Sequence, residues 1–90
     1  MSEFGVHGVE HVGESFFVIG RCYLGPLRLG DVFCTASVPG GLSSNVRLTV
    51  QTIEAYSRKW DEIDEGLTAR LELTGEGGDA VTEECILSTE

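Results

Sequence analysis

The sequence has few basic residues, no long apolar run and no leader-like start, and each absence removes a class of protein. Six Lys and Arg stand against fifteen Asp and Glu, for a net charge of −9. Nucleic-acid binding normally requires a basic face, so this balance argues against nucleic acid and favours a basic protein partner or a plain solvated surface. With no run of about 18 apolar residues, no membrane span is expected. The start, MSEFGVHG, lacks the basic and apolar regions of a signal peptide.

The three cysteines do not form the pattern of a disulfide-rich protein. Cys22, Cys34 and Cys85 are odd in number, widely spaced and without a CxxC pair. Such usage predicts a reducing, cytoplasmic compartment. Buried thiols that pack as small apolar groups are the favoured interpretation. A Cys22–Cys34 disulfide across a hairpin, or a zinc site that includes Cys85, is the alternative.

Catalytic motifs are missing as well. The sequence has no GxxxxGK[ST] phosphate loop and no GxSxG nucleophile elbow. The acid pairs at 61–62 and 64–65 lie in a charged, solvent-facing stretch, whereas a glycosidase-type acid needs a cleft. His7 and His11 are four residues apart on an expected strand, about 13 Å along it, which is too far to bind one metal ion. We therefore expect no enzyme activity, no metal and no cofactor.

What the chain does contain is apolar alternation punctuated by glycine. Residues 16–34, FFVIGRCYLGPLRLGDVFC, place two apolar runs around a GPLRLGD connection, which predicts a β-hairpin with a long turn. Residues 4–12 predict a strand with a bulge at Gly8. Val46, Leu48 and Val50 alternate with polar residues, and a change of phase predicts a bulge near Gln51.

The remaining segments also favour an all-β fold. Alternation over 69–73 and the apolar residues at 85–88 predict two further strands, and 37–45 is expected to be a loop. Residues 57–66 fit a connecting loop or a short helical turn. These segments predict one domain over residues 1–90, a small closed or nearly closed six-stranded antiparallel β-barrel.

The strand at 16–24 supplies the best candidate for a binding surface. If the small Gly20 faces the crowded interior with Val18 and Cys22, the alternate residues point outward. Those candidate partner-binding residues are Phe17, Ile19, Arg21 and Tyr23. Aromatic side chains beside an arginine are typical of binding hot spots. The alternative is that the first strand or the 37–45 loop covers them.

Trp60 is the second candidate for partner binding. It follows Arg58 and Lys59 in a charged stretch. A lone tryptophan there either packs against the end of the barrel or anchors a partner.

The order of these elements resembles the β-barrel second domain of the translational GTPases, the family of elongation factor Tu. The matching positions are Gly20-Arg21, Gly25, Leu27, Leu29, Gly30-Asp31, a strand over 52–56, Gly66, the 69–73 strand with Gly75, and Ile86-Leu87. The resemblance implies the elongation-factor domain 2 fold. Without a phosphate loop, we expect the barrel without the GTPase domain, and the acidic second half departs from a surface that contacts RNA.

We therefore predict a non-catalytic binding module that engages a protein partner in an accessory, regulatory or inhibitory role. The alternative function is a translation-associated factor that contacts ribosome or tRNA. Charge geometry separates the two functions. A contiguous basic patch formed by Arg21, Arg28, Arg47 and Arg58 favours RNA, and scattered arginines favour protein.

Overall fold

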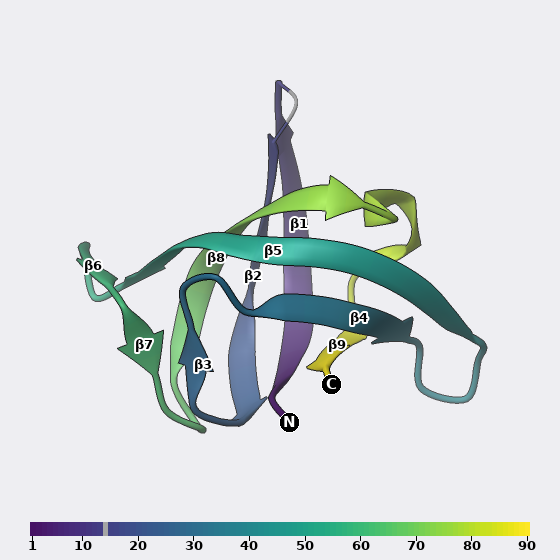
Figure 1. The fold of residues 1–90 in the computed structure, drawn as a ribbon, viewed down its shortest axis with the longest axis horizontal. Coiled ribbons are helices and arrows are strands. Elements are labelled where there is room, and N and C mark those ends of the chain that lie inside the picture. Colours follow the sequence, from purple (N-terminus) through teal and green to yellow (C-terminus); the bar gives the residue numbers. More distant parts are fainter. Residues whose placement is uncertain (14) are drawn as a thin grey trace.

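Six strands form a closed ring in the computed structural model, which describes residues 1–13 and 15–90 (Figure 1). They are β1 (Glu3–Val12), β2 (Ser15–Leu24), β4 (Val32–Ser37), β5 (Ser43–Ala55), β8 (Thr68–Glu76) and β9 (Ile86–Thr89). The order around the ring is β4-β9-β1-β2-β8-β5, and β5 pairs back onto β4. Every pairing is antiparallel. The predicted six-stranded antiparallel barrel is confirmed.

The short elements lie at the ends of the ring. β3 (Leu27–Arg28) pairs with β7 (Glu62–Ile63) in a separate two-stranded sheet, and β6 (Arg58–Trp60) extends the edge of β5. A single turn of 3-10 helix, η1 (Gly78–Ala80), follows β8. In the part of the chain that is described, no helix is long or apolar enough to cross a membrane.

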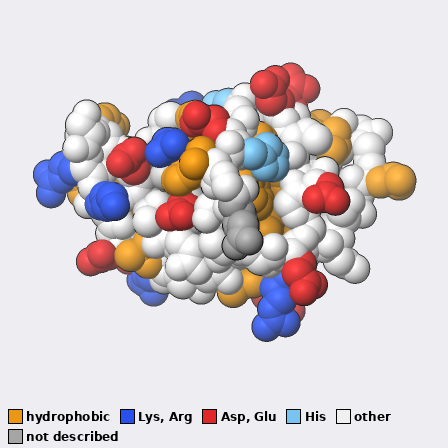
Figure 2. Space-filling view, turned by 90° about the horizontal axis from the view of Figure 1, so that it is seen from above, with side chains coloured by type: hydrophobic (Ala, Val, Ile, Leu, Met, Phe, Trp, Pro, Cys, Tyr) orange, Lys and Arg blue, Asp and Glu red, His pale blue; other side chains and the backbone are white. Residues whose placement is uncertain are grey.

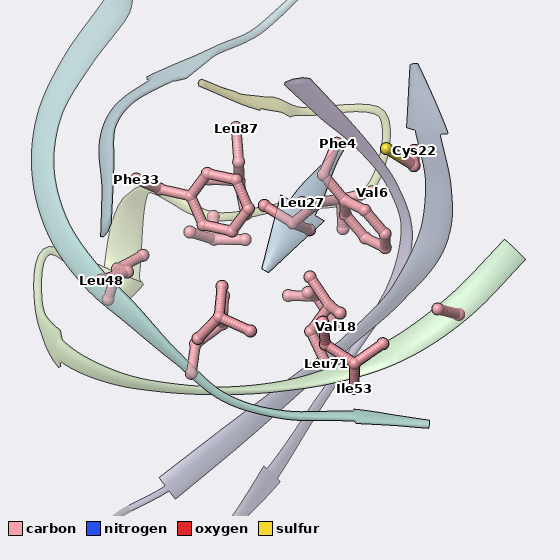
Figure 3. Packing of buried hydrophobic residues seen from close by; sticks show 14 of the residues in the cluster. Phe4, Val6, Val18, Cys22, Leu27, Phe33, Leu48, Ile53, Leu71 and Leu87 are labelled. Atoms are coloured by element: carbon pink, nitrogen blue, oxygen red, sulfur yellow. The ribbon is translucent and has the colours of Figure 1, made fainter. Parts of the chain in front are cut away.

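The core fills the interior of the ring because alternate residues of each strand point inward. Along β2 the buried positions are Phe16, Val18, Gly20 and Cys22, and along β8 they are Ala69, Leu71 and Leu73. Figure 3 shows Val18 and Leu71 on one side of the interior and Phe33 and Leu48 on the other, with Leu27 between them. Leu27 and Ile63 are 0% and 2% exposed. The β3–β7 pair therefore acts as a plug that closes one end of the barrel.

The predicted hairpin across residues 16–34 is wrong. β2 pairs with β1 and β8, whereas β4 pairs with β5 and β9. The connection between them carries the apolar Leu27, which is buried rather than left in a solvent-exposed turn. Cys22 and Cys34 consequently do not face each other across a hairpin, and all three cysteines are free thiols.

The structure also tests the predicted bulges and loops. Register shifts lie between Val6 and Gly8 and between Val50 and Thr52, which confirms both predicted bulges. The 37–45 loop is shorter than expected, because β4 extends to Ser37 and β5 begins at Ser43. Residues 57–66 contain β6 and β7 and no helical turn. The strands form there because β6 pairs with β5 and β7 pairs with β3, and the charged sequence gave no sign of these pairings.

Candidate binding face

Four of the predicted partner-binding residues share the outer face of β2. Phe17 is half-buried, and Arg21 is exposed. Ile19 and Tyr23 are 37% and 42% exposed. The positions Val18, Gly20 and Cys22 are buried, so the condition under which the alternate residues point outward is met. The outer row extends about 20 Å along the strand.

Tyr23 is aimed by a bulge that the sequence did not reveal. In the β1–β2 ladder Glu3 lies opposite Leu24 and Phe4 lies opposite Cys22, so Tyr23 is the extra residue. A bulge of this kind turns a side chain away from the regular pleat. A Cβ atom at Gly5 would overlap the Tyr23 ring, which shows that the ring lies across this glycine. One ring face therefore covers backbone, and the remainder meets solvent.

An acidic turn packs beside this end of β2. The Cys22 amide donates to the Leu67 carbonyl at 2.9 Å, and the Gly66 amide donates to the Cys22 carbonyl at 2.7 Å. Arg21 Nε donates to the Gly66 carbonyl oxygen at 3.1 Å. A Cβ atom on Gly25 would lie 2.8 Å from the Glu65 nitrogen. These contacts hold residues 61–66, DEIDEG, against the segment that carries Tyr23.

The 61–66 turn brings exposed carboxylates to the end of β2 that carries Tyr23 and Leu24. Asp61, Asp64 and Glu65 are exposed, and none of them is in an ion pair with a described residue. Glu62 differs, because it accepts a 2.6 Å bond from Arg28. We define the Tyr23 face as Tyr23 and Leu24, which are 42% and 41% exposed, together with Asp61, Asp64 and Glu65.

The ionisation of Cys22 reports how close these carboxylates lie. Burial raises the pKa of the Cys22 thiol, and the negative charges of Glu65 and Asp64 raise this pKa further. Their field therefore extends into the end of the barrel as well as out to solvent.

The other end of the outer row is already occupied by the chain itself. The Arg70 guanidinium lies 3.9 Å from the centroid of the Phe17 ring. Its Nε and Nη1 atoms lie 3.4 Å from a Glu10 oxygen and 3.7 Å from a Glu54 oxygen, respectively. These contacts cross the four neighbouring strands β1, β2, β8 and β5, through Glu10, Phe17, Arg70 and Glu54. Phe17 is better placed to stabilise the sheet than to receive a partner.

Trp60 does not belong to the same surface. It lies opposite the buried Ile53 in the β5–β6 ladder, so its side chain is on the core side of the sheet. Its indole Nε1 donates to the Ala55 carbonyl at 2.9 Å, and Arg58 covers its ring with 4.5 Å to the centroid. The indole packs against the core while remaining partly accessible.

The basic residues are distributed over separate elements. Arg47 lies near the start of β5 and Arg58 pairs with the last residue of that strand, about 26 Å away. Arg28 is ion-paired on β3, and Arg21 is on β2. Figure 2 shows blue and red side chains interspersed over the face that it presents. Arg21, Arg28, Arg47 and Arg58 therefore form no contiguous basic patch of the kind expected for an RNA-binding surface.

The histidines and cysteines are not arranged as a metal site. His7 and His11 are both exposed, and the His11 ring stacks on Phe16 with 5.7 Å between centroids. Among residues 1–13 and 15–90, no three His, Cys, Asp or Glu side chains are grouped so that they could hold a metal ion.

Differential thiol reactivity tests this arrangement. Burial raises the pKa of both Cys22 and Cys85, and their side chains are 0% exposed, whereas Cys34 is partly exposed. We expect an aromatic disulfide reagent to modify Cys34 in the folded protein and to reach Cys22 and Cys85 only after unfolding. The readout is thiol release with and without denaturant. Cys34→Ser should abolish the native reaction, and rapid native modification of Cys22 would contradict the described core.

Comparison with solved structures identifies the fold. Translation elongation factor SelB from Methanococcus maripaludis, in its apo form, matches with a TM-score of 0.76 at 17% sequence identity. The fold is that of a translation-factor β-barrel. SelB in complex with the GTP analogue GppNHp gives a TM-score of 0.75 at the same identity. Each match covers 99% of this chain and 19% of the SelB chain. No family model and no curated protein sequence matches the chain.

The resemblance predicted from the sequence is thus confirmed for the fold. The chain spans about a fifth of the SelB chain, with the whole ring included in the matched part. Residues that sequence reasoning missed are Leu24, Asp64 and Glu65, because only tertiary contacts bring the 61–66 turn to the end of β2. The run of acidic residues is visible in the sequence, but its position beside β2 in the folded chain is not.

Proposed function

We propose that this chain is a non-catalytic binding module that engages a basic protein through the Tyr23 face. The partner presents Lys or Arg side chains to Asp61, Asp64 and Glu65, and an apolar group to Tyr23 and Leu24. Charge of this kind accelerates association and selects against acidic competitors. The apolar centre supplies the residence time, because aromatic anchors carry most of the free energy of binding. A reducing, cytoplasmic setting is part of the proposal.

The observation that supports this function best is the coincidence of exposed apolar surface and uncompensated charge. Tyr23 and Leu24 expose about two fifths of their area, and the adjoining carboxylates have no cationic partner among the described residues. Elsewhere on the outer sheet, Arg70 is ion-paired with Glu10 and Glu54 and covers the Phe17 ring. A polar rim around an apolar centre is the usual anatomy of a protein interface.

Affinity capture with matched variants tests the proposal. Immobilised wild-type protein is exposed to lysate of the source cells, and retained proteins are identified by mass spectrometry and then titrated as purified components. We expect Asp64→Asn combined with Glu65→Gln to weaken binding of the retained protein about tenfold, mainly through the association rate. Tyr23→Ser should weaken binding by about thirtyfold, mainly through the dissociation rate.

Asp79→Asn combined with Glu83→Gln is the control, because it removes the same charge from exposed positions near the opposite end of the barrel. This control should bind as the wild type does. Thermal melts establish that each variant is folded. If Tyr23→Ser loses its fold, the charge variant decides, since it changes no buried contact. Equal binding by the charge variant and its control would refute the proposal.

The fold favours a second candidate, a translation-associated factor that contacts ribosome or tRNA. The support is the likeness to a part of SelB, a translation elongation factor. The scattered arginines and the net charge of −9 weigh against an RNA surface. Co-sedimentation with ribosomes in low and moderate salt discriminates the candidates. Retention that falls steeply with salt and is insensitive to Asp64 and Glu65 would favour the ribosome.

A further inference from the structure

The upper half of β1 is an unpaired strand edge. β1 pairs with β2 over its full length, but its pairing with β9 covers only Glu3 to Gly5. Two more backbone bonds join Val6 to Cys85 and Glu84. Beyond Val6, no backbone bond reaches that side of β1 from any described residue. In Figure 1 this half of the β1–β2 hairpin projects beyond the rest of the ring.

The alternation of an antiparallel ladder shows which groups face the open edge. Val6 uses its amide and carbonyl toward residues 84–85, so these groups point away from β2. The bulge between Val6 and Gly8 shifts the phase by one residue. Val9 and His11 then direct their N–H and C=O groups outward. Such a row of free donors and acceptors is a template for another strand.

The sequence along this edge is close to a palindrome. Residues 6–12 read VHGVEHV, so that Val6 matches Val12 and His7 matches His11 about a centre at Val9. The open part of the edge begins at His7 and includes this centre. A two-fold axis through Val9 therefore pairs residue His7 of one copy with His11 of the other. A two-fold contact requires a self-complementary surface of this kind.

We propose that a second copy of this chain pairs with β1 in antiparallel fashion, centred on Val9. Gly8 then lies opposite Glu10 of the second copy on the outer face. Shifting the centre to Glu10 would oppose two like charges, so the Val9 register is favoured. The ladder ends at His7, because residues 84–85 occupy the edge beside Val6. This inference does not rest on the proposed function, whose Tyr23 face is at the other end of β2.

Opposite charges placed at residue 8 test the pairing. A Cβ atom at Gly8 meets no atom within 4 Å, so the isolated chain tolerates a side chain there. Gly8→Glu places two carboxylates across the interface twice per dimer, and we expect the dimer dissociation constant to rise about tenfold. Gly8→Lys places a cation opposite Glu10 of the second copy and should lower the dimer dissociation constant about tenfold. Sedimentation equilibrium over a wide concentration range measures both constants.

Leu42→Glu and Leu42→Lys provide the control for net charge, because Leu42 is 88% exposed in the β4–β5 loop. These two variants should dimerise as the wild type does. If either residue-8 variant unfolds, the other still decides. The proposal is overturned if the wild type and Gly8→Lys stay monomeric at every concentration, or if dimerisation ignores the charge at residue 8. Hydrogen-exchange protection of Val9 and His11 only when another protein is added would assign the edge to that protein.

Discussion

Replacing Gly20 by valine is expected to lower the free energy of unfolding by about 3 kcal/mol, a large part of the stability of a small domain. Gly20 is buried on the inner face of β2, between Val6 of β1 and Ala69 of β8. A Cβ atom there would overlap the Gly5 carbonyl oxygen and approach the Phe4 ring to 3.0 Å. The overlap is with backbone, so a change of rotamer cannot relieve it. Urea denaturation measures the loss.

Gly8 provides the matched control for this substitution. It is on β1 in the same pair of strands, and an added Cβ atom meets nothing within 4 Å. Gly8→Ala should change the free energy of unfolding by less than about 0.5 kcal/mol. If Gly20→Val were as stable as Gly8→Ala, the close approach of β1 and β2 would be wrong.

Leu27→Ala is expected to lower the free energy of unfolding by about 3 kcal/mol. Leu27 is 0% exposed and pairs with Ile63 in the plug that closes one end of the barrel. Truncation leaves a cavity among Phe4, Val6 and Phe33, seen around Leu27 in Figure 3. For a domain of this size the melting temperature should fall by roughly 4 to 8 °C per kcal/mol.

Leu29→Ala is the control, because Leu29 lies two residues further along the same connection and is 41% exposed. It should cost less than about 1 kcal/mol. If Leu27→Ala costs as little stability as Leu29→Ala, the connection is a solvent-exposed turn, as the hairpin prediction implied, and the plug does not exist.

Local patterns predicted the strands well but not their partners. Alternation over 46–50 and 69–73 placed Leu48, Leu71 and Leu73 in the core, and the change of phase located the bulge before Thr52. These features depend on neighbours in sequence, which a pattern can show. Pairing β2 with β8 joins residues some fifty positions apart, and nothing local encodes that choice.

The same distinction explains the binding face. The outward direction of Ile19, Arg21 and Tyr23 followed from strand alternation and the small inward Gly20. The bulge at Tyr23 and the approach of the 61–66 turn did not follow, because both depend on long-range register and packing. Arg70 was missed as the cover of Phe17 for the same reason. Charge composition left a solvated acidic surface and a basic partner as alternatives, and it did not show which acids are ion-paired in the folded chain.

The likeness to a part of SelB bears on architecture at 17% identity, so partner choice has to be argued from this chain's own surface. The outer sheet is stabilised internally by Arg70, Glu10 and Glu54, and the end near Tyr23 is not. The two ends of β2 therefore have different roles in the proposal. In this proposal, one end holds the sheet together and the other receives a partner.

Amide hydrogen exchange of the captured complex tests the central claim most directly. With the partner bound, the account predicts slower exchange of amides at residues 22–24 and 61–66, and no change at residues 78–84, which lie near the opposite end of the barrel. Protection confined to residues 78–84, or to the 38–42 loop, would contradict a partner site on the Tyr23 face.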